Sequence, residues 1–271
     1  MKNINLDELK KVQLDVLQAI HEFCIEENIK YSLGCGSMLG MIRHRGYIPW
    51  DDDIDIYLLR TDYDKLISKF PVKYKEIYDI DSLERNPHCE RAYAKAYDTR
   101  TIVEEKAEYK CKIGVNIDIY PIDKVPDDFD EWKRYNRMRR FIQRLYELKV
   151  IKINNSRKFY KTIVILLGKL LLLPISRRCL AGFINSFAQK YNNTDSNKVF
   201  ECVQGMLQKR PFEHSLFEKL KLMPFEDRIF CGFEDYDKYL SNAYGNYMKL
   251  PPLEKRVAHH DFIAYWITQN K

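Results

Sequence analysis

The sequence GCGSMLGMIRHRGYIPWDDDIDIYLL, residues 34–59, contains the two features that decide the predicted fold. Four aspartates stand just before an apolar run that reads as a strand: Asp51, Asp52, Asp53 and Asp55. Because side chains alternate along a strand, Asp51, Asp53 and Asp55 are expected on one face and Asp52 on the other. Three carboxylates on one face repel one another unless open water or a cation surrounds them, and hard oxygen ligands suit Mg²⁺ or Mn²⁺. The run therefore predicts a divalent metal site, with a solvated acidic turn as the alternative.

A Gly-Ser pair supplies the second feature. Gly36 and Ser37 lie between a predicted short strand, residues 29–35, and a helix-like apolar segment that begins at Met38. Backbone amides at such a turn favour an anion, and the missing side chain of glycine lets a phosphate approach closely. We expect Gly36 and Ser37 to bind a substrate phosphate. Arg43 and Arg45, in the loop that follows, are candidates to bind donor or acceptor charge.

A second acidic strand is predicted at residues 115–120, where apolar and polar side chains alternate. Asp118 falls on the polar face, and Pro121 is expected to end the strand. The alternative for Asp118 is an ordinary strand residue that faces solvent.

A Gly-Ser turn followed by paired aspartates on a strand resembles the pattern of the nucleotidyltransferase superfamily. Three blocks are, more narrowly, similar to the LicD family, which contains bacterial choline phosphotransferases, fukutin and fukutin-related protein: GSMLGMIRHRGYIPWDDDIDI (36–56), VNIDIYPID (115–123) and YGNYMKLPPLEKR (244–256). The resemblance implies an α/β (α+β) protein with a nucleotidyltransferase-like mixed sheet. In such a sheet the strand of Asp118 lies beside the strand of Asp53.

The LicD resemblance also implies a reaction. Family members are taken to move a phospho-alcohol, most often phosphocholine, from a CDP-activated donor to a hydroxyl of a cell-surface or lipid-linked glycan, releasing CMP. Metal-assisted phosphoryl transfer of this kind needs carboxylates that hold the ion and one group that accepts a proton. Asp53, Asp55 and Asp118 are therefore predicted to be catalytic, with Asp118 as third metal ligand or base. Asp51 is an auxiliary ligand of the Mg²⁺ or Mn²⁺ ion.

Several other side chains are candidates for substrate binding. Lys95, like Arg91, stands on or beside a predicted strand at residues 92–97, where it either faces a nucleotide phosphate or is an exposed strand cation. His259 is a candidate acid, base or phosphate partner, with a structural role as the alternative. A choline group would be bound by aromatic rings, for which the following are candidates: Trp50, Tyr47, Tyr244 and Tyr247.

Two other functions are compatible with these residues. The first is a nucleotidyltransferase acting on a small alcohol or antibiotic, which would release pyrophosphate from CTP or ATP. The second is a catalytically silent glycan-binding protein that keeps the fold. Intact Asp53, Asp55 and Asp118 argue against a silent protein, because such a protein has no need of carboxylates that repel one another.

The chain has 271 residues, 45% of them hydrophobic and 31% charged, which is typical of a folded globular protein. Seven scattered cysteines without a C-x-x-C pair, and an N-terminal segment without an apolar core, predict reduced thiols and a cytoplasmic location. Although the net charge is +6, residues 131–181 contain fourteen basic and two acidic residues, so the rest of the chain is net acidic. No nucleic-acid-binding motif is present, and a nucleic-acid partner is not expected.

Three parts are predicted along the chain: a catalytic core at residues 1–130, a basic helical region at 131–200, and a C-terminal segment at 201–271 that completes the site. The most hydrophobic stretch, residues 162–176, is shorter than the roughly 20 residues that span a bilayer. Basic residues flank it. We expect either a buried core helix or a helix that lies on an anionic membrane surface, at the inner face of the plasma membrane.

Overall fold

A mixed β-sheet forms the centre of the protein. The computed structural model describes residues 2–105, 112–151, 159–204, 209–257 and 262–267. The sheet has the order β2-β3-β7-β5-β4, with β8 also paired to β7 and β9 to β8. Its strands are β2 (Ser32–Leu33), β3 (Asp55–Leu59), β4 (Tyr78–Asp81), β5 (Ala94–Asp98), β7 (Asn116–Val125), β8 (Lys198–Glu201) and β9 (Phe212–Glu213). β3 and β7 run parallel and the other neighbours are antiparallel, so the predicted α/β fold with a mixed sheet is confirmed.

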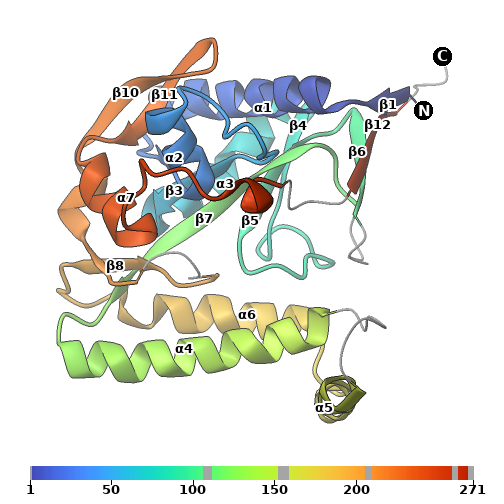
Figure 1. Ribbon diagram of the computed structural model, residues 1–271, viewed down its shortest axis with the longest axis vertical. Coiled ribbons are helices and arrows are strands. Elements are labelled where there is room, and N and C mark those ends of the chain that lie inside the picture. Colours follow the sequence, from blue (N-terminus) through green and yellow to red (C-terminus); the bar gives the residue numbers. More distant parts are fainter. Residues whose placement is uncertain (1, 106–111, 152–158, 205–208, 258–261, 268–271) are drawn as a thin grey trace.

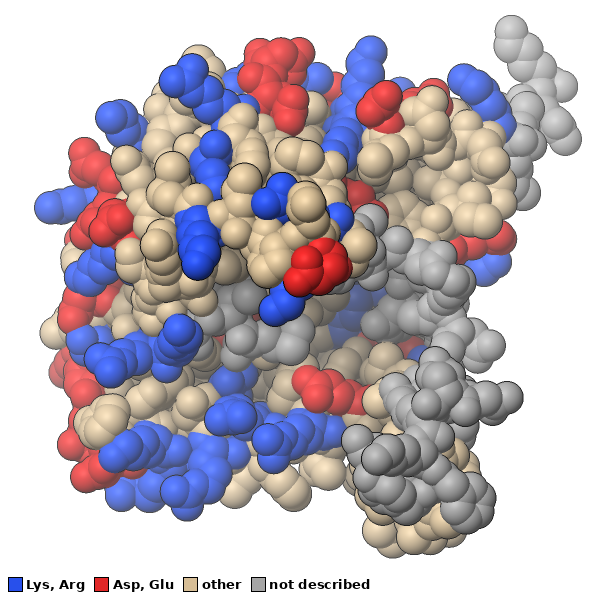
Figure 2. All heavy atoms as spheres, in the orientation of Figure 1, with Lys and Arg blue, Asp and Glu red and all other residues tan. Residues whose placement is uncertain are grey.

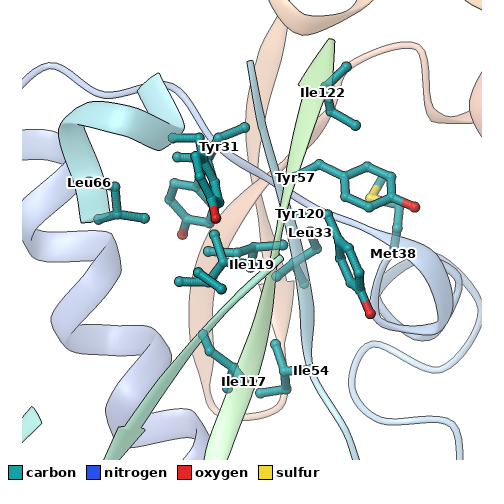
Figure 3. Packing of buried hydrophobic residues seen from close by; sticks show 14 of the residues in the cluster. Tyr31, Leu33, Met38, Ile54, Tyr57, Leu66, Ile117, Ile119, Tyr120 and Ile122 are labelled. Carbon is teal, nitrogen blue, oxygen red and sulfur yellow. The ribbon is translucent and has the colours of Figure 1, made fainter. Parts of the chain in front are cut away.

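Helices cover both faces of this sheet. α1 (Leu6–Glu26) and α3 (Arg60–Tyr74) pack on one face, and α2 (Cys35–Arg43) packs on the other. The side chains of β3 and β7 alternate accordingly: Figure 3 shows Ile119 on the side of Leu66 from α3, whereas Tyr57 and Tyr120 lie on the side of Met38 from α2. The face toward α2 is therefore the face on which the alternating polar residues of β7 project.

The strand boundaries differ from the prediction in two places. The strand expected at residues 29–35 is limited to β2, and α2 already begins at Cys35, so Gly36 and Ser37 lie in the first turn of a helix. β3 begins only at Asp55, and the three preceding aspartates are not part of the strand. The alternation predicted for Asp51, Asp52 and Asp53 therefore does not apply.

Pro121 does not end β7, contrary to the prediction, because the strand continues to Val125. On one edge β7 pairs with β5 through Ile119, and on that edge β8 takes over from Ile122. Proline lacks the N–H that a sheet ladder needs, and it is tolerated where such pairing is interrupted. Pro121 sits in the gap between the two partners of β7.

Three helices form a layer below the sheet in Figure 1: α4 (Phe129–Val150), α5 (Phe159–Leu171) and α6 (Arg177–Ala188). The carboxylate of Asp128 caps α4 by accepting the N–H of Glu131 at 2.8 Å. The ring of Tyr135 stacks on Phe187 of α6, with 4.9 Å between centroids. α6 continues into a short 3-10 helix, η1 (Gln189–Tyr191).

The C-terminal part of the chain packs back on its beginning. A hairpin of β10 (Leu220–Phe225) and β11 (Arg228–Phe233) follows the 3-10 helix η2 (His214–Phe217), and α7 (Tyr236–Tyr244) and η3 (Leu253–Lys255) come next. β12 (Phe262–Trp266) pairs with both β1 (Lys2–Ile4) and β6 (Thr101–Glu105), which brings the two ends of the chain together (Figure 1). The part boundaries at residues 130 and 200 stay a prediction. Among the described residues, no helix is both long and apolar enough to cross a membrane.

Candidate active site

Two carboxylates lie side by side at the centre of the sheet. Asp55, the first residue of β3, is the register partner of Asp118 in the parallel strand β7. The two strands are thus neighbours, as predicted. Asp55 and Asp118 lie on the same face of the sheet as Tyr57 and Tyr120. The rings of these two tyrosines pack edge to face, with 5.9 Å between their centroids. The sheet therefore presents two acids together on the side that α2 covers.

Asp55 is buried among other negative charges. Only 7% of its surface is exposed, and its backbone N–H donates to the Ser37 hydroxyl at 2.9 Å. Burial, and then the charges of Asp53 and Asp118, hold the pKa of Asp55 well above its usual range. A buried carboxyl in this position needs either a proton or a nearby cation.

The three aspartates before β3 form a cluster of their own. One carboxylate oxygen from each of Asp51, Asp52 and Asp53 lies within 4.8 Å of the other two, a spacing at which the three could hold a metal ion. Hard carboxylate oxygens are the ligands that Mg²⁺ and Mn²⁺ prefer, so the donor set fits a divalent cation. Asp52 was not predicted as a ligand, because side chains that alternate along a strand at residues 51–53 would have turned it to the other face.

Asp118 is held by two neighbours. Its Oδ1 accepts a hydrogen bond from Lys95 Nζ at 2.5 Å, and its Oδ2 accepts one from the Tyr120 hydroxyl at 3.2 Å. Lys95 also donates to Asn116 Oδ1 at 3.0 Å. The strand cation predicted to face a phosphate is therefore ion-paired with a site carboxylate. Arg91, the other such candidate, is buried and paired with Asp81.

The first turn of α2 contacts the acids directly. A Cβ atom added at Gly36 would lie 2.7 Å from Asp51 Oδ2, so glycine is what lets that carboxylate approach the helix. Ser37 is buried and accepts the N–H of Asp55, as described above. The backbone N–H groups of a first helical turn have no partner within their own helix. Gly36 and Ser37 thus join the start of α2 to the acidic cluster.

Cys35 fixes the turn from which α2 starts. Its φ of 42° lies in the left-handed region that residues other than glycine rarely adopt. Its N–H donates to the Tyr239 hydroxyl at 2.9 Å, and its Sγ lies 2.9 Å from the Tyr57 hydroxyl. Contacts with α7 and β3 therefore hold the strained residue. The sequence offered no signal for this role, because the hydrogen bond to the Cys35 N–H comes from a residue 204 positions away.

Arg43, the last residue of α2, lies near a second arginine, Arg256. Arg43 donates to the carbonyl of Tyr247 at 2.9 Å and to His44 Nε2 at 2.9 Å. Burial lowers the pKa of Arg43, and the nearby positive charge of Arg256 lowers it further, against an opposing effect of Tyr244. Arg256 lies over the Trp50 ring, 5.5 Å from its centroid. Arg256 was not singled out from the sequence, although it ends the third block that resembled the LicD family.

The other residues predicted to bind substrate differ in their exposure and contacts. Arg45 is exposed in a turn whose carbonyl accepts the N–H of Glu226 at 2.7 Å. The hydroxyl of Tyr247 donates to Asp237 at 2.8 Å, so this ring is fixed against α7. Tyr47 is buried, and its hydroxyl donates to Gln13 Oε1 at 3.0 Å, which leaves it unsuited to bind choline. His259 lies outside the described residues.

Comparison with known proteins supplies the family. Residues 28–155 match the sequence profile described as LicD/FKTN/FKRP, nucleotidyltransferase domain. The lipopolysaccharide cholinephosphotransferase LicD of Haemophilus influenzae is 31% identical over 273 aligned positions, which cover 98% of this chain and 99% of that protein. An uncharacterized protein of Rickettsia typhi is 28% identical over 159 positions, about half of each chain. The chain belongs to the LicD family and is a LicD-type phosphotransferase.

Proposed function

We propose that the protein transfers phosphocholine from CDP-choline to a hydroxyl of a cell-surface glycan and releases CMP. The observation that carries the proposal is the placement of Asp55 beside Asp118, next to the cluster of Asp51, Asp52 and Asp53. The likeness over nearly the full length to a lipopolysaccharide cholinephosphotransferase supports CDP-choline as donor and a lipopolysaccharide-type glycan as acceptor.

In this reaction the acceptor hydroxyl attacks the phosphorus that carries choline. A P–O bond to the glycan forms, the P–O bond to CMP breaks, and the hydroxyl proton passes to a base. Positioning and charge stabilisation account for most of the catalysis of phosphoryl transfer. A bound Mg²⁺ or Mn²⁺ ion would neutralise the diphosphate of the donor.

We assign the carboxylates two tasks. Asp51, Asp52 and Asp53 would hold the cation, since one carboxylate oxygen of each lies within 4.8 Å of the other two. We assign Asp55 as a further ligand, because burial and the charges of Asp53 and Asp118 raise its pKa and a cation would offset that charge. Asp118 is either a further ligand or the base that accepts the proton, and the hydrogen bond from Lys95 Nζ, at 2.5 Å, fixes the orientation of its carboxylate. The Lys95 ammonium also brings a positive charge next to the transferred phosphate in this assignment.

Donor binding falls to the start of α2 and to the arginine pair. The first-turn amides at Gly36 and Ser37 suit a phosphate of CDP, because a helix N-terminus favours anions. Arg43 and Arg256 add charge near Trp50. Trp50 already accepts a cation over its ring, and a quaternary ammonium is bound by the same interaction. We therefore place the choline group at Trp50 rather than at Tyr47.

Turnover assays test the proposal. The purified full chain is incubated with CDP-choline, lipopolysaccharide that lacks phosphocholine, and Mg²⁺, and CMP release and phosphocholine on the glycan are measured. We expect both products in equal amounts and none with EDTA. Pyrophosphate release from CTP or ATP, with no CMP from CDP-choline, would instead identify a nucleotidyltransferase. Glycan binding that EDTA leaves unchanged, with no nucleotide turnover, would identify a silent binding protein.

A further inference from the structure

Helix α5 presents apolar side chains to solvent. Within the part of α5 whose side chains are described, residues 162–171, six are exposed, from 39% to 79% of their surface: Ile163, Val164, Leu166, Leu167, Leu170 and Leu171. At 3.6 residues per turn these six occupy one half of the helix circumference. The helix of a soluble domain normally turns such a face toward the core. The apolar half of α5 therefore has no partner among the described residues, and an exposed surface of this kind marks an interaction site.

The opposite half of α5 attaches the helix to α4. Gly168 lies directly against Leu148, because a Cβ atom at Gly168 would come within 2.4 Å of Leu148 Cδ2. Lys149 Nζ donates to the carbonyl of Leu172 at 2.7 Å, and Leu172 is buried. The outward direction of the leucines is thus fixed by contacts on the inner side, and α5 projects beyond the α4–α6 pair in Figure 1.

The exposed side of α4 is basic. It carries five exposed cations: Lys133, Arg134, Arg137, Arg140 and Arg144. Two exposed acids, Asp130 and Glu147, accompany them, and Asp130 is paired with Lys133 at 3.3 Å. Exposed Met138 and Phe141 lie among the arginines, so apolar and basic side chains are mixed on this side. Figure 2 shows the Lys and Arg side chains gathered along the lower edge of the molecule, over α4.

We propose that the outer sides of α4 and α5, here called the α4–α5 surface, dock on an anionic lipid bilayer with α5 lying among the headgroups. Aliphatic side chains beside arginines and lysines are what a helix in a membrane interface needs, because the first enter the acyl boundary and the second bind anionic headgroups. The inference does not depend on the proposed reaction. It would bring the enzyme to lipid-linked glycans.

Charge complementarity favours a bilayer over the other occupants. A second copy of the chain, related by a twofold axis, would set the arginines of α4 against one another, and like charges in contact oppose association. Nucleic acid would use the arginines but would leave the leucines of α5 in water. An anionic bilayer satisfies both kinds of side chain at once.

The charge at this surface comes from α4 rather than from the residues that flank α5 in sequence. Arg178, one of the basic residues that flank residues 162–176 in sequence, donates to the carbonyls of Leu83, Asn86 and Cys89, so it anchors a loop. Arg177 faces the buried Glu90 at 3.6 Å. Arg157 and Lys158 lie outside the described residues, as does the side chain of Lys161.

Vesicle cosedimentation of the full-length protein tests the proposal. The vesicles contain phosphatidylcholine alone or phosphatidylcholine with phosphatidylglycerol, each at about 0.05 M and about 0.5 M salt. We expect binding to the anionic vesicles only, and at least about tenfold weaker binding at the higher salt. The triple variant Arg137→Gln/Arg140→Gln/Arg144→Gln should bind about 100-fold more weakly. The double variant Leu167→Gln/Leu171→Gln should lose about tenfold or more.

A matched control carries the same kinds of change elsewhere. Lys221 and Leu222 are exposed on β10, away from the α4–α5 surface, and Lys221→Gln/Leu222→Gln should bind vesicles like the parent. All variants should keep the parent melting temperature and the parent rate on a water-soluble acceptor. The proposal is overturned if the parent does not bind anionic vesicles, or if both α4–α5 variants bind as the parent does. It is also overturned if Leu167→Gln/Leu171→Gln converts a dimer to a monomer in ultracentrifugation and leaves vesicle binding intact, since the occupant is then a second copy.

Discussion

The acidic site and the α4–α5 surface each concentrate one sign of charge, but they do so in opposite environments. Burial, and then the charges of neighbouring carboxylates, raise the pKa of Asp55, whereas Asp118 is tied to Lys95 and Tyr120. Arg137 and Arg140 are exposed on a helix. Interactions between charges are strong where water is excluded and weak where water and salt screen them. In the acidic site, the strength of an interaction therefore depends on where each carboxylate lies. On the α4–α5 surface, it depends on how many basic side chains are present.

The largest expected effect comes from single changes in the acidic site. Asp53→Asn or Asp55→Asn keeps the volume of the side chain and removes a ligand charge, so turnover with saturating Mg²⁺ should fall about 1000-fold or more. Phosphocholine transfer from CDP-choline, measured beside a melting curve, checks this. Asp227→Asn, at a carboxylate that is 81% exposed, is the control and should be fully active. Near-parental rates in both site variants would remove the metal-site assignment.

The next effect concerns how the helical layer is joined to the sheet. Arg60 of α3 donates to both carboxylate oxygens of Asp123 in β7, at 2.8 and 2.6 Å, and to Asn185 of α6 at 3.0 Å. Asp123 is fully buried, so Arg60→Met would leave its charge with too little compensation, which typically costs about 3 kcal/mol or more. Chemical denaturation measures the loss.

Arg85→Met is the matched control for that stability measurement. Arg85 pairs with Asp79 at 3.2 Å, but both side chains are one-third exposed. Exposed ion pairs contribute about 0–1 kcal/mol. Equal losses of unfolding free energy in Arg60→Met and Arg85→Met would mean that burial does not strengthen the ion pair of Arg60 with Asp123.

How far the sequence predicted these regions depends on whether the deciding contacts are local. The placement of Asp118 on the polar face of its strand followed from alternation, and the position of that strand beside the strand of Asp55 followed from the family resemblance. Alternation is a short-range pattern, and the resemblance rests on short blocks of sequence, so neither depends on knowing the distant contacts. The mixed α/β fold and the LicD family were likewise predicted correctly.

The errors arose where distant residues decide the local conformation. Residues 51–53 gather as a cluster instead of continuing β3, and Asp52 was turned the wrong way in the prediction. Pro121 stays within β7 because two other strands share one edge of it. Arg256 reaches the ring of Trp50 across about 200 residues of sequence. A single sequence contains no periodic pattern from which these contacts could be predicted. The individual site roles stay predictions, as does the cytoplasmic location.

A smaller effect is expected where α2 meets the cluster. Gly36→Ala would place a Cβ atom 2.7 Å from Asp51 Oδ2, and the carboxylate must move to make room. Asp51 would still be present but its carboxylate would be shifted, so turnover or Mg²⁺ affinity should fall about tenfold. Alanine is also the better helix former, so the melting temperature should not fall. Gly182→Ala on α6 is the control, since nothing lies within 4 Å of its added Cβ. Unchanged Mg²⁺ dependence in Gly36→Ala would show that Asp51 does not hold the ion.

The smallest effect is a pH dependence of stability in the presence of chelator. Because the folded-state pKa of Asp55 lies well above its unfolded value, the native protein keeps this proton over a pH range in which the unfolded chain has lost it. Stability from this group is therefore greatest below the ordinary aspartate pKa of about 4 and falls as pH rises toward the folded-state pKa. Asp55→Asn removes this dependence, so its melting temperature should match the parent's at low pH and exceed it by a few degrees at higher pH.

Saturating Mg²⁺ should reverse the order of the two melting temperatures at the higher pH. A ligand that binds only the native state stabilises it, and the variant has lost part of the site for that ligand. On the α4–α5 surface, by contrast, Arg140→Gln should shift neither the pH profile nor the response to Mg²⁺, because an exposed guanidinium stays charged and hydrated whether or not the chain is folded. The difference in melting temperature between the parent and Asp55→Asn could instead stay constant across the pH range, with and without Mg²⁺. Asp55 would then ionise freely. The buried acidic site would then behave like the exposed surface, and the contrast between the two regions would fail at the residue where it is expected to be sharpest.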